Sequence, residues 1–219
     1  MPPADPSQNP LTLTPINLHE PLQFAELQRQ RVLCGWNYST SVIESWRADN
    51  DAHIQSMFWI VPATLAHLPP PQCYAGHIAM AKKTYSNENG IDAVLPSLTT
   101  MDLKALFILP AYRGGGLAKV AVREVEKMAE VEPYGCPECK AMTLNTLARR
   151  YVEEDELRAV AEVAHRLEGT ELPKKGMSNE DWYARMGYVK WKEVELYPAR
   201  DGEGKEFKFG ASFMWKALG

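Results

Sequence analysis

The first part of the chain alternates between strand and helix patterns. Leucine alternates with threonine over residues 11–16, which predicts a short, half-buried strand. Apolar residues then recur every three or four positions over 20–36, and Gly35 is a typical helix end. The residues expected on the buried face of this helix are Leu22, Phe24, Ala25, Leu27 and Val32. A second helix is predicted over 39–51, with an apolar stripe formed by Val42, Ile43 and Trp46.

The next part of the chain has the pattern of a strand meander. Apolar runs predict strands over 57–61, 73–82 and 98–109. Turn-forming residues separate them, with three prolines at 69–71 and the sequence N-E-N-G at 87–90.

After Pro110 the pattern changes to alternating helices and strands. The strand that precedes it runs through three glycines into an amphipathic helix, whose apolar face is marked by Leu117, Ala121, Val125 and Met128. The elements predicted after this helix are a strand over 141–147, a helix over 154–167, a short helix over 178–187 that opens with a capping box, and a hairpin of strands over 190–196 and 206–216.

This order predicts an α/β fold with a mixed, largely antiparallel central sheet of about seven strands, flanked by helices. Residues 1–10 carry four prolines and few groups that can pack, so we expect a disordered leader followed by a single domain over 11–219.

Composition narrows the classes of function. The chain has 219 residues, 45% of them hydrophobic and 24% charged, which suits a globular domain. Its net charge of -4 gives no reason to expect nucleic acid as a partner. No stretch approaches the roughly 18 apolar residues of a membrane span, and the N-terminus lacks the pattern of a secretory signal. Four cysteines in a chain of this length suggest reduced thiols, so we expect a cytoplasmic protein without a membrane partner.

The segment 106–118 carries the strongest chemical signal. Three consecutive glycines after a buried strand allow positive φ angles and a close approach of the backbone to another molecule. The helix that follows offers free N–H groups and the positive end of its dipole, which favours an anion such as a diphosphate. Arg113 adds a donor fork suited to phosphate. The spacing fits neither a P-loop nor a first Rossmann turn, and a flexible strand-to-helix turn remains the alternative.

The sequence L-F-I-L-P-A-Y-R-G-G-G-L-A in this segment resembles the acetyl-coenzyme A motif of the GNAT superfamily of N-acetyltransferases. A second element, D-W-Y-A-R-M-G-Y at 181–188, is similar to a later helix end of that superfamily, and the order of elements matches over nearly the whole chain. The resemblance implies acetyl-coenzyme A as cosubstrate. It also implies cofactor-binding roles for Leu106, Phe107, Ile108, Arg113, Gly114, Gly115, Gly116, Leu117 and Ala118, with Asn145 as a looser candidate.

The resemblance also suggests two catalytic residues. An alkylamine is almost wholly protonated at neutral pH, so a base must remove a proton before the amine can attack a thioester. Asp102 occupies the position of this base at the start of the fourth strand, and Tyr183 that of the acid that protonates the departing thiolate. The alternatives are a solvated strand-start carboxylate for Asp102 and a packing aromatic beside Trp182 for Tyr183.

The leading hypothesis is an N-acetyltransferase that transfers an acetyl group directly to a primary amine of a small molecule. The alternatives are a peptide or protein amine as acceptor, a non-catalytic acyl-coenzyme A binding module, or a different nucleotide-binding fold. The stretch 149–177 is a helical insertion relative to most members, for which we expect a role in substrate choice, a contact in a homodimer, or simple packing on the sheet edge. No metal site is predicted, because the C-x-x-C at 136–139 has no second ligand pair and the histidines show no ligand spacing.

Overall fold

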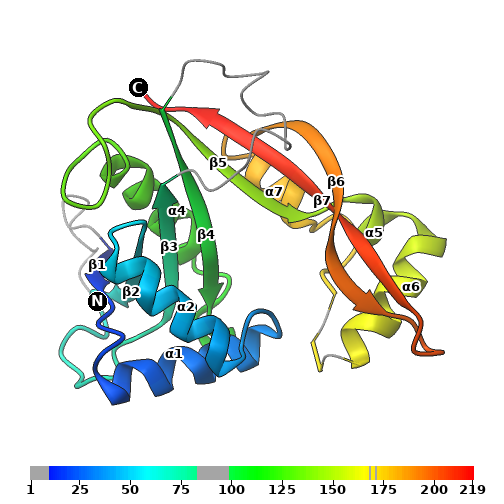
Figure 1. Ribbon diagram of the computed structural model, residues 1–219, viewed down its shortest axis with the longest axis horizontal. Helices are drawn as coiled ribbons and strands as arrows, with labels where there is room; N and C mark the ends of the chain where they lie inside the picture. The colour runs from blue at the N-terminus through cyan, green and yellow to red at the C-terminus, as the bar shows by residue number, and fades with distance from the viewer. Residues whose placement is uncertain (1–9, 83–98, 168, 171) are drawn as a thin grey trace, which may run out of the picture. The chain divides into compact units, whose positions relative to one another are not determined.

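The computed structural model describes residues 10–82, 99–167, 169–170 and 172–219. Predictions made for residues 1–9 of the leader and for the turn at 87–90 lie outside the described residues. The chain divides into two compact units (Figure 1), and each is described by itself. Unit 1 consists of the described residues of Met1–Thr84 together with Met101–Cys139, and unit 2 of the rest.

Unit 1 is built on four strands in the order β1-β2-β3-β4. Their bounds are Leu11–Pro15 for β1, Gln55–Pro62 for β2, Gly76–Lys82 for β3 and Thr99–Ile108 for β4. Each neighbouring pair is antiparallel, with Leu13 opposite Ile60 and Phe58 opposite Ile78. Every residue of β2 except Ser56 is buried, because helices cover this part of the sheet on both faces.

Two helices cover one face of these strands, α1 over Pro21–Cys34 and α2 over Thr40–Asp51. The side chains of Leu27 from α1 and Ile43 from α2 pack with Trp59 of β2 in one fully buried cluster. Local signals fix the helix ends. Gly35 ends α1 in the left-handed conformation, and the Ser39 hydroxyl caps α2 by accepting a hydrogen bond from the backbone of Val42.

The buried face of α1 differs from the prediction. Leu22 and Val32, expected in the core, are 76% and 57% exposed. Apart from Leu27, the buried residues of α1 are polar, namely Glu26, Gln30 and Arg31, while Phe24 is partly buried against the same cluster as Leu27. The prediction was wrong for Leu22 and Val32 because it assumed that a helix turns all its apolar residues inward, whereas part of this helix faces a buried histidine on β3 that needs polar partners.

On the opposite face of the sheet lies α4, Leu117–Met128, whose buried residues are Ala121, Val122, Val125 and Glu126. Ala121 and Val125 belong to the predicted apolar face, and Val122 lies beside it. Residues three to four positions apart lie on one side of a helix, which explains why these side chains are buried together. The short 3-10 helix η2, Pro110–Tyr112, joins β4 to the glycine segment that precedes α4.

Unit 2 has three strands in the order β5-β7-β6, antiparallel throughout. Their bounds are Cys139–Leu147 for β5, Val189–Arg200 for β6 and Glu206–Ala217 for β7. The helices are α5 over Arg150–Glu153, α6 over Asp155–Leu167 and α7 over Asn179–Ala184. The terminal hairpin of β6 and β7 is confirmed, but its turn is shorter than predicted. Pro198 lies within β6, which is the edge strand of this order, where a missing N–H is tolerated.

The predicted fold class is confirmed: the described residues form an α/β structure with seven strands, largely antiparallel, and flanking helices. Among the described residues, no helix combines the length and the apolar character required to cross a membrane.

Candidate active site

Strand β4 contains a bulge in front of the predicted cofactor segment. His77 of β3 lies opposite Phe107, whereas Ala79 lies opposite Lys104, so β4 holds one residue more than β3 over this interval. Ala105 adopts a φ of 50°, in the left-handed region, which costs a residue other than glycine about 1–2 kcal/mol. A bulge bends a strand and changes the direction of the groups that follow it, in this case the backbone of residues 106–108.

The end of β4 is held tightly against β3. A Cβ atom at Gly76 would lie 2.1 Å from the carbonyl oxygen of Phe107, so only glycine allows this approach. The backbone N–H of Leu109 donates to the carbonyl of Ala75 at 2.9 Å. The side chain of Arg113 folds back and donates from Nε to the carbonyl of Ile108, also at 2.9 Å. These contacts therefore fix the end of β4, from which the chain continues into the glycine segment.

The glycine segment and the start of α4 form an open, positively polarised surface. Gly114 and Gly116 have φ angles of 85° and 80°, and a Cβ atom at any of the three glycines would meet nothing within 4 Å. Gly116 is the N-cap of α4, so no side chain caps the helix, and its first turn contains no acidic residue. The first N–H groups of a helix have no acceptor within it. The arrangement suits an anion bound by backbone amides.

Asp102 is buried on β4, with 1% of its surface exposed. It lies opposite Ala81 of β3, and residues directly opposite each other share a face of the sheet. This face is the one covered by α1 and α2, because Ala79, two residues away on β3, packs in their cluster. The alternative that Asp102 is a solvated strand-start residue is therefore wrong. A buried carboxylate requires partners or a function.

A buried polar network that the sequence analysis did not identify lies beside β4. His77 is fully buried, and its ring makes a hydrogen bond of 2.8 Å from Nδ1 to Oε1 of Gln30. Nη1 of Arg31 lies 3.5 Å from the other ring nitrogen. Burial, with the positive charge of Arg31, lowers the pKa of His77 well below 6.5, so the imidazole is neutral and Nδ1 is the donor. The ring also contacts Phe107, with 5.6 Å between ring centroids.

Nothing in the sequence around His77 marks it, since an isolated histidine in an apolar strand has no distinctive spacing. The polar face of α1 is the one signal that could have identified the network, because Glu26 and Gln30 are one turn apart on the same helix. The amide nitrogen of Gln30 donates to Glu26 at 2.8 Å, which completes the chain of hydrogen bonds.

Tyr183 and Asn145 belong to unit 2, while Asp102 and residues 106–118 belong to unit 1. Tyr183 lies on α7, where its ring contacts Trp182 and Tyr188 at centroid distances of 4.8 Å and 5.7 Å. The predicted N-cap of α7 is confirmed, since Ser178 accepts a hydrogen bond from the backbone of Asp181, whose carboxylate accepts one from the Ser178 hydroxyl in return. Asn145 accepts a hydrogen bond of 2.5 Å from the hydroxyl of Tyr197.

The four cysteines are free thiols. Sγ of Cys136 donates to the carboxylate of Glu138 at 2.8 Å. Within the described ranges, no group of three or more histidine, cysteine or acidic side chains is arranged to hold a metal ion.

No model of a known protein family matches the sequence, and neither does any curated protein at a significant level. Solved structures do match the fold. NAA60 of Arabidopsis thaliana, in complex with a bisubstrate analogue, aligns with a TM-score of 0.60 at 15% identity, over 95% of this chain and 99% of that chain.

An aminoglycoside 6'-N-acetyltransferase complexed with coenzyme A aligns with a TM-score of 0.54 at 14% identity, over 94% of this chain and 97% of that one. A spermidine N-acetyltransferase, the SpeG chimera from Vibrio cholerae and hSSAT, aligns with a TM-score of 0.53 at 11% identity, over 95% and 96%. The chain therefore has the fold of the GNAT acetyltransferases.

Proposed function

We propose that the protein is an acetyl-coenzyme A-dependent N-acetyltransferase that transfers the acetyl group directly to a primary amine of a small molecule. The observation that carries this proposal is the open glycine segment leading into the uncapped N-terminus of α4, directly after a bulged strand, in the fold of the GNAT acetyltransferases. Acetyl-coenzyme A would supply the acetyl group as a thioester.

The residues present suit this cosubstrate. The backbone N–H groups of residues 114–118 would bind the diphosphate, and the absence of an acidic residue in the first turn of α4 leaves the positive end of the helix dipole uncompensated. The backbone of 106–108, redirected by the bulge, would hold the pantetheine arm and donate a hydrogen bond to the thioester carbonyl. Such fixed donors stabilise the negative charge that develops on that oxygen. Asn145 remains a candidate cofactor contact.

We assign the proton transfers to Asp102 and Tyr183. Asp102 would accept the proton of the amine, directly or through a water, so that the nitrogen lone pair can form the C–N bond. The C–S bond then breaks, and the hydroxyl of Tyr183 would donate a proton to the departing thiolate.

A small-molecule acceptor is supported by two of the proteins with matching structures, an aminoglycoside N-acetyltransferase and a spermidine N-acetyltransferase. The four free cysteines favour a reducing compartment, so we place the protein in the cytoplasm as part of the same proposal. A homodimer stays a prediction.

The proposal is tested by assaying free thiol release from acetyl-coenzyme A with a panel of amines that includes aminoglycosides, polyamines, amino acids and peptide N-termini. We expect turnover with at least one small amine. The Asp102→Asn variant should lower kcat by about 100-fold or more, the usual contribution of a general base. Asp51→Asn, a matched change at an exposed aspartate of unit 1, should leave kcat unchanged. Binding of coenzyme A without turnover of any amine would favour a non-catalytic binding module instead.

A further inference from the structure

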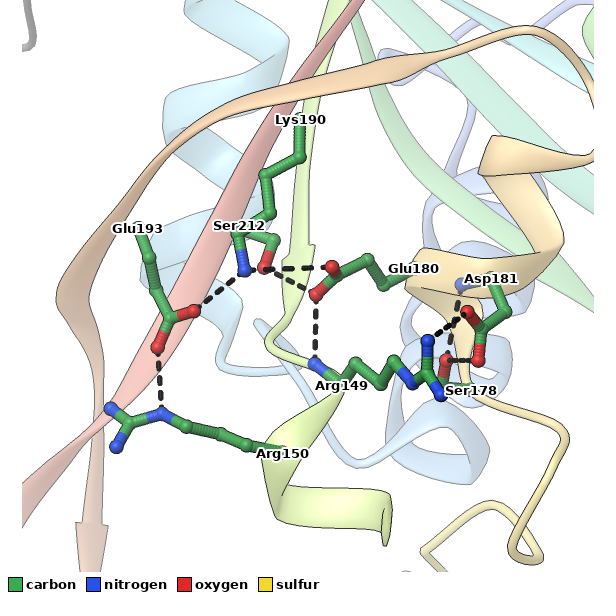
Figure 2. A network of polar contacts seen from close by, with 8 residues as sticks. All are labelled: Arg149, Arg150, Ser178, Glu180, Asp181, Lys190, Glu193 and Ser212. Atoms are coloured by element: carbon green, nitrogen blue, oxygen red, sulfur yellow. Dashed lines mark hydrogen bonds and ion pairs between the residues drawn. The ribbon is translucent and has the colours of Figure 1, made fainter.

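A network of charged and hydroxyl groups surrounds the N-terminus of α7 in unit 2 (Figure 2). It connects the helix that carries Tyr183 to β6, to β7 and to the segment that follows β5. Its members are Arg149, Arg150, Ser178, Glu180, Asp181, Lys190, Glu193 and Ser212.

Glu180, the second residue of α7, is the centre of this network. One carboxylate oxygen accepts a hydrogen bond of 2.5 Å from the hydroxyl of Ser212 on β7 and one of 2.8 Å from the backbone N–H of Arg149, two residues after the end of β5. The other oxygen lies 3.4 Å from Nζ of Lys190 on β6. Ser212 is fully buried, so one end of this arrangement is inaccessible to water. A single side chain thus ties α7 to β6, to β7 and to the segment that follows β5.

A second carboxylate holds the lysine that Glu180 contacts. Nζ of Lys190 lies 2.7 Å from Glu193, whose other oxygen accepts a hydrogen bond of 2.7 Å from Nε of Arg150. Burial raises the pKa of Glu193, but its hydrogen bonds and charge interactions with Lys190 and Arg150 outweigh that effect, and the pKa is lowered overall. The carboxylate stays ionised at neutral pH and keeps Lys190 in place beside Glu180.

The first turn of α7 is held at two further points. The hydroxyl of Ser178 donates to Asp181 at 2.7 Å, and Nη1 of Arg149 lies 3.3 Å from the other oxygen of Asp181. With six residues, α7 is far shorter than the roughly 12–15 residues that an isolated helix needs to be stable in water. Its position therefore depends on these contacts and on packing.

Tyr183 is three residues after Glu180, which places both on neighbouring positions of the same helical surface. The carbonyl of Tyr183 accepts hydrogen bonds of 2.9 Å from the N–H of Met186 and 3.2 Å from the N–H of Tyr188, so the turn after it is also ordered. A shift of Glu180 would move Tyr183 as part of one short rigid unit.

We propose that Glu180 is a positioning residue for Tyr183: its carboxylate, held by Ser212, the Arg149 amide and Lys190, fixes the helix that carries the phenol. This inference rests on the proposed function, in which the hydroxyl of Tyr183 protonates the departing thiolate. The rate of such a proton transfer depends on where the donor group lies, and a displacement of that group by about 1 Å can lower the rate about 100-fold.

A double-mutant cycle tests the inference. Glu180→Gln, which keeps the shape but loses the charge, should lower kcat by about 10- to 100-fold and leave the KM for acetyl-coenzyme A unchanged. In a Tyr183→Phe background the same change should have no further effect on kcat, because the group that it positions is gone. Ser212→Ala removes one of the three contacts of Glu180. It should lower kcat by a smaller factor, and it too should have no further effect on kcat in the Tyr183→Phe background. Glu206→Gln, an exposed ion-paired carboxylate on β7, is the matched control and should leave kcat unchanged.

The outcomes separate the claims. If Glu180→Gln lowers kcat equally in both backgrounds, or if it changes only the free energy of unfolding, the positioning role is refuted while the acetyltransferase survives. If Tyr183→Phe itself leaves kcat unchanged, both the acid and its positioning residue are refuted. If the wild-type protein transfers acetyl to no amine, the proposed function fails and this inference fails with it.

Discussion

Substituting Gly115 by alanine separates the stability of the glycine segment from its capacity to bind a ligand. Gly115 is the one residue of the three whose φ lies outside the left-handed region, and a Cβ atom there would meet nothing within 4 Å. Alanine can take this conformation without strain, so Gly115→Ala should leave the free energy of unfolding unchanged or raise it by about 0.4–1 kcal/mol. Gly114→Ala and Gly116→Ala should each lower it by about 1–2 kcal/mol, because both glycines are left-handed.

Ligand binding should respond differently. If a diphosphate lies against the backbone at Gly115, a methyl group there displaces it and weakens at least one hydrogen bond to a charged group, worth about 1.5–3 kcal/mol. That corresponds to roughly a 10- to 100-fold increase in the Kd for coenzyme A. Titration calorimetry measures the Kd, and urea denaturation of the ligand-free protein measures the stability. The control is Gly202→Ala, at a glycine that also lies outside the left-handed region but belongs to unit 2. Wild-type affinity in a fully stable Gly115→Ala protein would refute the reasoning.

Two further predictions concern the buried parts of unit 1. Because the pKa of His77 is lowered in the folded state, the unfolded chain binds more protons below about pH 6.5, and stability should fall by up to about 1.4 kcal/mol per pH unit as the pH drops. In the His77→Gln variant the free energy of unfolding, measured by urea denaturation from about pH 7 to about pH 5, should depend less steeply on pH. The same dependence on pH as in the wild type would contradict the lowered pKa of His77. Gly76→Ala should lower the free energy of unfolding by about 3 kcal/mol, since its Cβ would lie 2.1 Å from the Phe107 carbonyl oxygen; a cost as small as that of Gly202→Ala would show that β3 and β4 can separate there.

Local signals in the sequence predicted much of the fold and the position of the glycine segment. Gly35 and the Ser178 capping box ended or began helices where expected, because their effects act within a few residues. The three glycines predicted an open backbone surface for the same reason, since a missing Cβ is a property of the residue itself.

Features that depend on partners distant in the chain were not predicted. The bulge at Ala105 has no signal of its own, because alanine takes a positive φ only when the register with β3 requires it. The polar inner face of α1 follows from His77, about 50 residues away, and a single helix period cannot reveal that partner. The role inferred for Glu180 likewise comes from β6, β7 and the segment after β5, which all contact its carboxylate and none of which the capping-box pattern indicates.

The central claim is that the backbone from Gly114 to Ala118 binds the diphosphate of coenzyme A. The most direct measurement is the change in backbone amide chemical shifts when coenzyme A is titrated into the isotope-labelled protein. We predict that the amide resonances of Gly115, Gly116 and Leu117 shift in a saturable manner, while those of Gly202 and Gly204 in the turn between β6 and β7 stay in place. Saturation of the protein with coenzyme A without any shift of the first group would contradict the claim.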